Sequence, residues 1–141
     1  MQTRKATAVW HGGLEEGKGK IQFGGGRFDE PYSAGSRFEN ENATNPEELI
    51  AAAHAGCFSM AFALGLAKAG HQPEEIQTEA AVTIEEQGGG FAITSSKLST
   101  RATVPGIDPD TFQQQAETAK ANCPVSKALA GCDIQIEATL N

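Results

Sequence analysis

The sequence predicts an α+β fold in which antiparallel sheets surround one central helix. Residues 3–10 and 18–23 alternate polar and apolar side chains, as strands do. The stretch from Asn45 to Gly70 carries the start and stop signals of a long helix. Further alternating segments follow it, so strands come in consecutive runs with helices between the runs. The predicted order is βββ-α-ββ-αα-β, which is not the alternation of a doubly wound sheet.

The first three strands are expected to form a β-meander. Glycines separate the first two strands, and Gly24 to Gly26 form the next break. The sequence FDEPYSAGSRFE supplies a third strand around an irregular loop, and Pro31 places that strand at a sheet edge. A phosphate-binding loop at the three glycines is disfavoured, because neither a following Lys-Ser/Thr nor the GxGxxG spacing is present.

The central helix is predicted from its capping residues. Asn45 is a good N-cap, Pro46 suits the first helical position, and Gly70 suits the C-cap. No residue from 49 to 67 is charged, which by length permits a membrane span. Many of these residues are alanine or glycine and a histidine interrupts them, so we expect a helix wrapped on all sides by protein.

The rest of the chain is predicted to return to the sheet. Residues 76–87 and 91–104 form a long β-hairpin, and residues 133–140 form a last alternating strand. Between them Asp108 caps a helix that reaches Lys120. Pro124 fits the first turn of a further short helix, which places Cys123 at its N-terminal end.

Length and charge limit the class of protein. The 141 residues fit a single domain, 1–141, with an ordinary globular composition. The net charge of −7 disfavours nucleic acid and membrane surfaces as partners. The N-terminal residues have no apolar core and no cleavage site of a signal peptide, so we expect a cytoplasmic protein.

Three cysteines, Cys57, Cys123 and Cys132, carry the possible chemistry. Their odd number and the absence of CxxC spacing disfavour a secreted disulfide scaffold and a thiol–disulfide oxidoreductase. His54 together with the cysteines is not paired as zinc ligands usually are, so no metal is expected. Thiol chemistry and simple burial of the thiols both remain open.

A peroxidase thiol needs a nearby cation that favours the thiolate and donates hydrogen bonds to the peroxide. Arg37 is a candidate, and Glu47 is a carboxylate that would hold its guanidinium in place. A surface ion pair is the alternative interpretation of these two residues.

Several segments together resemble the OsmC/Ohr family of hydroperoxide reductases, and its OsmC branch in particular. They are TNPEELIAAAHAGCFSM at 44–60, NCPVS at 122–126, RFE at 37–39, GFAIT at 90–94 and VPGID at 104–108. The resemblance implies that Cys57 is the peroxidatic thiol, Cys123 the resolving thiol, and Arg37 with Glu47 the ion pair that organises the pocket. It also implies an intertwined homodimer with sites at the subunit interface, alkyl and fatty-acid hydroperoxides as substrates, an external dithiol as reductant, and no metal or organic cofactor.

Three questions stay open at this point. The same fold would also serve a redox sensor or an apolar-ligand-binding stress protein without rapid turnover. Cys132 competes as a resolving thiol, and His54, three residues before Cys57, is either a catalytic partner or a packed core histidine. Because ten residues of straight helix span about 15 Å, we expect a break at Gly56 that brings Glu47 closer to Cys57 and places Cys57 at a helix N-terminus.

Overall fold

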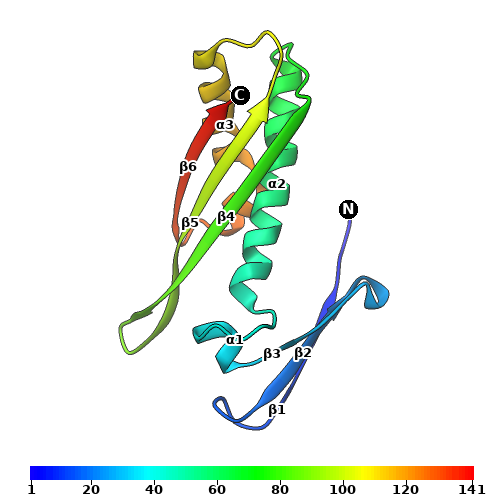
Figure 1. The fold of residues 1–141 in the computed structure, drawn as a ribbon, viewed down its shortest axis with the longest axis vertical. Helices are drawn as coiled ribbons and strands as arrows, with labels where there is room; N and C mark the ends of the chain where they lie inside the picture. Colours follow the sequence, from blue (N-terminus) through cyan, green and yellow to red (C-terminus); the bar gives the residue numbers. More distant parts are fainter. The chain divides into compact units, whose positions relative to one another are not determined.

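The computed structural model describes residues 1–141, which form two compact units, residues 1–49 and 50–141. Figure 1 shows the order of elements along the chain. The predicted α+β class and element order are confirmed, with one additional short helix, α1 (Ala34–Phe38), after the third strand. The boundary between the units falls inside helix α2 (Pro46–Lys68), after Leu49.

The first unit contains the predicted meander. Strands β1 (Ala6–His11), β2 (Lys18–Phe23) and β3 (Phe28–Tyr32) pair antiparallel, with β2 in the centre. Pro31 lies on the edge strand β3, as predicted. The turn at Gly24–Gly26 is confirmed, because all three glycines have positive φ, a conformation that other residues rarely adopt.

The second unit contains a sheet of β4 (Glu75–Gln87), β5 (Gly90–Thr103) and β6 (Asp133–Leu140), in that order. Strands β4 and β5 form the predicted antiparallel hairpin. The prediction of purely antiparallel sheets is wrong for the last strand, because β6 pairs parallel to β5. The two helices between them, α3 (Pro109–Asn122) and α4 (Pro124–Ala128), form a crossover that returns the chain in the same direction.

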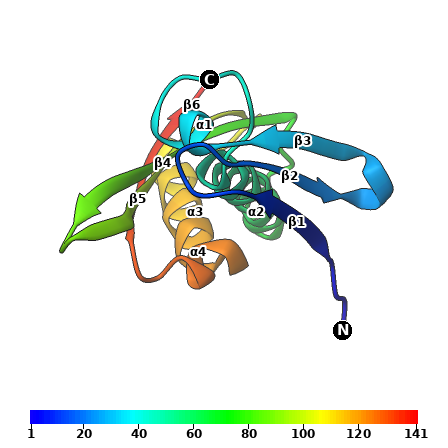
Figure 2. The same cartoon turned by 90° about the horizontal axis from the view of Figure 1, so that it is seen from below.

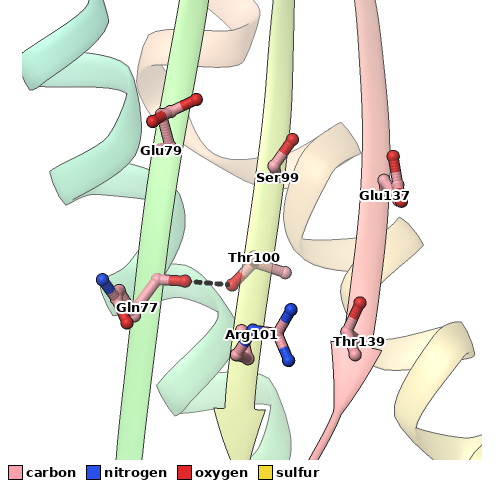
Figure 3. Close-up of a pocket in the computed structure, with 7 residues that line it drawn as sticks. All are labelled: Gln77, Glu79, Ser99, Thr100, Arg101, Glu137 and Thr139. Carbon is pink, nitrogen blue, oxygen red and sulfur yellow. Dashed lines mark hydrogen bonds between the residues drawn. The ribbon is translucent and has the colours of Figure 1, made fainter.

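Helices α2 and α3 lie on one face of the β4–β5–β6 sheet, as Figure 1 and Figure 2 show. The inward side chains of β5 alternate with exposed ones, and Leu98 and Ala102 join the core. Phe62 of α2 stands between Phe58 and Phe112, with ring centroids 5.5 and 5.3 Å away. Figure 3 shows the opposite face of the same sheet, which carries polar side chains.

Helix α2 differs from the sequence prediction at Gly56 and agrees with it at Gly70. It runs from Pro46 to Lys68 as one helix, so the predicted break at Gly56 is wrong. No neighbouring atom lies within 4 Å of the position that a Cβ at Gly56 would take, and glycine permits a kink without enforcing one. The prediction of Gly70 as C-cap is confirmed by its φ of +90° and by the bond that the N–H of His71 donates to the carbonyl of Leu66.

Only one side of α2 is covered within a single chain. A buried stripe at spacings of four residues faces the core: His54, Phe58, Phe62 and Leu66. A parallel stripe of Ala52, Gly56, Met60 and Leu64 is exposed, so the helix is not wrapped on all sides. By length and composition α2 is long and apolar enough to cross a membrane, and 22% of its most apolar window is buried inside the protein. Its buried residues Phe58, Phe62 and Leu66 belong to the core of the second unit.

Candidate functional site

The fold brings Cys57 and Cys123 together. Cys57 lies in the middle of α2, and Cys123 lies at the junction where α3 ends and α4 begins. Their thiols lie close enough for each to alter the pKa of the other, although 65 residues separate them in the chain. Cys123 is fully buried and Cys57 is partly exposed, so solvent and small molecules reach the pair from the side of Cys57.

The two thiols ionise with different ease. Burial raises the pKa of Cys57, the hydrogen bond and charge of Cys123 raise it further, and the Val125 N–H acts in the opposite direction. Burial also opposes ionisation of Cys123, but hydrogen bonds from Cys57, from the backbone and side chain of Ser126 and from the Val125 N–H leave its pKa lowered. Because each thiol affects the pKa of the other, the apparent pKa values belong to the pair and not to either residue alone.

The N–H groups that favour the thiolate come from the first turn of α4. Cys123 is its N-cap, and Pro124 occupies the first position without an N–H, so the next free donors are those of Val125 and Ser126. The sequence predicted this helix and the place of Cys123 correctly. It assigned the dipole effect to Cys57, which the unbroken helix α2 excludes.

An apolar groove opens beside Cys57. It has a volume of about 1030 Å³ and runs between α2 and α3. Met60 and Leu64 contribute its exposed apolar side chains, and Ala119 and Pro124 line the α3–α4 side. Phe58 and Phe62 of the same helix do not line the groove, because they belong to the core.

His54 is fully buried and both of its ring nitrogens have hydroxyl partners. Nδ1 lies 2.6 Å from Oγ of Ser96 on β5, and Nε2 lies 2.8 Å from Oγ of Ser126 on α4. Burial lowers the pKa of His54, so the ring is neutral at neutral pH. The expectation of a packed core histidine is confirmed, and its hydrogen bonds lead away from Cys57 to Ser126.

The predicted pair of Arg37 and Glu47 forms within residues 1–49. The guanidinium donates from Nη2 to Oε1 at 2.8 Å and from Nε to both carboxylate oxygens at 3.0 and 3.3 Å. The Glu47 side chain is 8% exposed and that of Arg37 36%, so this is not a surface ion pair. The guanidinium also lies 5.4 Å from the ring centroid of Phe38.

Local capping positions this ion pair. Ser33 and Ser36 form a capping box that starts α1, which carries Arg37. The amide of Asn45 donates to the carbonyl of Ser36, and its side-chain oxygen accepts from the N–H of Glu48 at the start of α2. One asparagine thereby ties the helix that carries the arginine to the helix that carries the glutamate.

The remaining polar groups offer no competing site. Cys132 lies away from the pair, where its thiol donates to the carbonyl of Leu129. No group of three or more His, Cys, Asp and Glu side chains is arranged to hold a metal ion. The hollow of Figure 3 is a polar surface of the sheet that contains neither a cysteine nor a histidine; its lining is Gln77, Glu79, Ser99, Thr100, Arg101, Glu137 and Thr139.

Comparison with known proteins agrees with this arrangement. The family model described as "OsmC-like protein" matches residues 39–138. Peroxiredoxin OsmC of Escherichia coli is 47% identical over 127 residues, which are 89% of this chain and 89% of that protein. The chain belongs to the OsmC-like family.

Other members of the family are more distant. The organic hydroperoxide resistance protein of Xanthomonas axonopodis is 35% identical over 100 residues, 70% of this chain and 68% of that protein. A crystal structure of an organic hydroperoxide resistance protein from Elizabethkingia anophelis, with thiocyanate bound, is similar in fold to this chain, with a TM-score of 0.74. The two sequences are 28% identical, and the match covers 100% of this chain and 96% of that chain. The resemblance inferred from the sequence motifs is therefore confirmed.

Ser96 and Ser126 are the residues that sequence reasoning missed. Both lie far from His54 in the sequence and become its partners through the packing of β5 and α4 against α2. Ser126 belongs to the family-like segment NCPVS, but no sequence signal linked it to a histidine.

Proposed function

We propose that this OsmC-like peroxidase reduces organic hydroperoxides to alcohols through a sulfenic acid at Cys57 and a disulfide between Cys57 and Cys123. The observation that carries the proposal is that the two thiols lie close enough for each to alter the pKa of the other, because a resolving thiol must come within bonding reach of the oxidised one. Cys57 takes the first step, since it is the thiol that the groove exposes.

The groove supports an apolar hydroperoxide as substrate. It lies directly beside Cys57 and is lined mainly by apolar atoms of α2 and α3. Each methylene that such a surface removes from water contributes about 0.8 kcal/mol to binding. Hydrogen peroxide has no apolar part and gains nothing from the groove. The names of the relatives, peroxiredoxin and organic hydroperoxide resistance protein, are consistent with this substrate class.

We further propose that the protein is a homodimer and that Arg37 and Glu47 complete the site. The exposed stripe of Ala52, Gly56, Met60 and Leu64 is the kind of apolar surface that a second copy covers. A cation beside Cys57 would offset its raised pKa, and within residues 50–141 only Cys123 and the Val125 N–H act on that thiol. The family resemblance implies sites at the subunit interface, which supports this proposal.

The single domain 1–141, the external dithiol reductant and the cytoplasmic location remain predictions. Dithiol reduction follows from the chemistry, because the disulfide must be opened by thiol exchange before a second turnover. The relatives favour a soluble protein.

Turnover of cumene hydroperoxide with excess dithiol tests the assignment. Cys57→Ser must abolish consumption, and Cys123→Ser must consume no more than one equivalent in the absence of added thiol. Cys132→Ser is the matched control and must retain wild-type turnover, because Cys132 lies outside the pair. Normal turnover in Cys57→Ser would refute the mechanism. Oxidation without turnover in the wild type would favour the redox-sensor alternative.

Mixed dimers test whether the site is shared between subunits. Arg37→Met and Cys57→Ser chains are inactive alone, but a site built from both subunits is intact once in every mixed dimer. Random mixing then restores about one quarter of wild-type activity. No restoration on mixing would show that each chain supplies its own arginine.

A further inference from the structure

We propose that Lys68 binds the carboxylate of a long-chain acid whose hydroperoxide group lies at Cys57. This inference rests on the function proposed above and adds a specificity-determining residue to the same groove. The residues of α2 that line the groove extend from Cys57 to Ala69, and Lys68 is the only charged side chain in the whole lining.

Helix α2 places the cysteine and the lysine at the two ends of one line. Lys68 follows Cys57 by 11 residues, which is about three turns of helix, so both side chains leave α2 on the same side. Leu64 follows Cys57 by about two turns and lies between them. Because an α-helix rises about 1.5 Å per residue, the two ends of this line are about 16 Å apart.

The interval between the two ends carries no charge. On α2 it consists of apolar side chains and a glycine: Met60, Ala61, Leu64 and Gly65. On α3 it consists of uncharged side chains at helical spacing: Gln115, Thr118, Ala119 and Asn122. An alkyl chain can therefore lie along the groove, but a carboxylate finds an opposite charge only at Lys68.

The ammonium group of Lys68 is free to bind such a carboxylate. The side chain is exposed, and the four ion pairs of the structure involve other residues. No Asp or Glu lines the groove to compete for the ammonium group. The protein as a whole carries a net charge of −7 and repels anions, so a preference for an acid over its neutral ester requires a local cation.

The distance from Cys57 to Lys68 also selects the length of the substrate. An extended alkyl chain of about twelve carbons matches the span of about 16 Å. An acid that carries its hydroperoxide group at that distance from the carboxylate reaches both residues at once, whereas a shorter acid reaches only one. Met60 and Leu64 also belong to the exposed stripe of α2, so the second copy proposed above would cover the alkyl chain from its open side.

The experiment compares an acid with its own methyl ester. Both carry a hydroperoxide group about twelve carbons from the carboxyl carbon, and kcat/KM is measured with excess dithiol below the concentration at which the acid forms micelles. The wild type should favour the acid about threefold to fivefold, as one exposed ion pair allows, and mainly through KM. Lys68→Gln should lower this ratio to about one, Lys68→Glu should favour the ester, and Lys68→Arg should keep the preference.

Lys120→Gln is the matched control. Lys120, like Lys68, lies in the last turn of a helix that forms the groove, where a cation also stabilises the helix end. It pairs with Glu117 at 3.2 Å outside the groove lining, so the variant should keep the wild-type ratio of acid to ester. An equal loss in Lys120→Gln and Lys68→Gln would indicate a general effect of charge and overturn the proposal.

A shorter substrate tests the spacing. With the hydroperoxide group about five carbons from the carboxyl carbon, the acid cannot span the groove, and the wild type should show the ratio of Lys68→Gln. The proposal is wrong if Lys68→Gln leaves the ratio for the long acid unchanged, or if the wild-type ratio is the same for both lengths.

Two outcomes separate this proposal from those on which it rests. If Lys68→Gln weakens the dimer while the ratio stays unchanged, Lys68 contacts the second copy and not the substrate. If the wild type consumes neither the acid nor the ester, the proposed function fails. Calorimetric titration with dodecanoate then tests the site alone: binding should be about threefold weaker in Lys68→Gln, and absent or equal binding refutes the carboxylate site.

Discussion

Replacing Arg37 by methionine tests how firmly the Arg37–Glu47 pair holds its unit together. The substitution removes contacts of 2.8, 3.0 and 3.3 Å and leaves a carboxylate that is 8% exposed without a counter-charge. Breaking a fully buried ion pair costs about 3–5 kcal/mol. The Arg37 side chain is 36% exposed, so water can enter where the guanidinium was, and we expect a loss of about 2 kcal/mol.

A double-mutant cycle turns this expectation into a measurement. Glu47→Gln keeps the shape and one acceptor oxygen, so it should cost about 1 kcal/mol. The double variant should cost about 2 kcal/mol, because removing the charge of Glu47 relieves the penalty of losing Arg37. Urea unfolding at one fixed protein concentration gives the four free energies of unfolding, since dimerisation makes stability depend on concentration.

One result of the double-mutant cycle would contradict the proposed coupling of Arg37 and Glu47. If the loss in the double variant equals the sum of the single losses within about 0.5 kcal/mol, the pair does not couple and the argument is wrong. Lys20→Met is the matched control, because Lys20 pairs with Asp29 at 3.1 Å on an open surface of the meander. That variant should change the free energy of unfolding little.

Three further substitutions test the account of the second unit. Phe62→Ala should lower the free energy of unfolding by about 3–5 kcal/mol, since the ring is fully buried between two others, and a loss below about 1 kcal/mol in urea unfolding would contradict the packing described. Gly70→Ala should cost about 1 kcal/mol, because an alanine must adopt the positive φ of the α2 C-cap; the thermal midpoint should fall accordingly. The pKa of His54 is lowered in the folded protein, so below the usual histidine pKa near 6.5 the unfolded chain binds more protons than the folded one. The contribution of His54 to stability is therefore complete above that pH and is lost as the pH falls. The urea concentration at the unfolding midpoint should fall as the pH is lowered below about 6.5. In His54→Gln this midpoint should fall less.

Local signals were enough to predict most elements of the fold. Asn45, Pro46 and Gly70 mark a helix whose bounds the structure reproduces within two residues. The alternation of residues 133–140 gives the last strand with its observed ends. Such features depend on residues close together in the chain, which is why a single sequence reveals them.

The features that could not be predicted depend on contacts between distant segments. The parallel pairing of β6 depends on where the α3–α4 crossover returns the chain, and alternation is the same for either direction. The unbroken helix through Gly56 is a second case, because a glycine in a helix interior is compatible with both a kink and continuity. Helix α1 is only five residues long and too short for a periodic pattern to identify.

The candidate site also combines features that local sequence predicts with features that depend on contacts between distant segments. The family-like motifs identified Cys57 and Cys123, and packing brought their thiols together, but the environment of each thiol came only from the fold. No sequence pattern states that Cys123 is the buried member, or that Ser126 bonds a histidine 72 residues away in the chain.

Access and ionisation favour different members of the thiol pair, and this asymmetry defines what the rest of the molecule must supply. Cys57 is reached through the groove but has a raised pKa, whereas Cys123 has a lowered pKa but is fully buried. A hydroperoxide therefore meets the thiol that ionises less readily. Moving one proton between the two thiols places the charge on Cys57, and a guanidinium near that sulfur would stabilise this state. In the mechanism proposed above, the arginine held by a buried glutamate is the cation that would meet this requirement of Cys57.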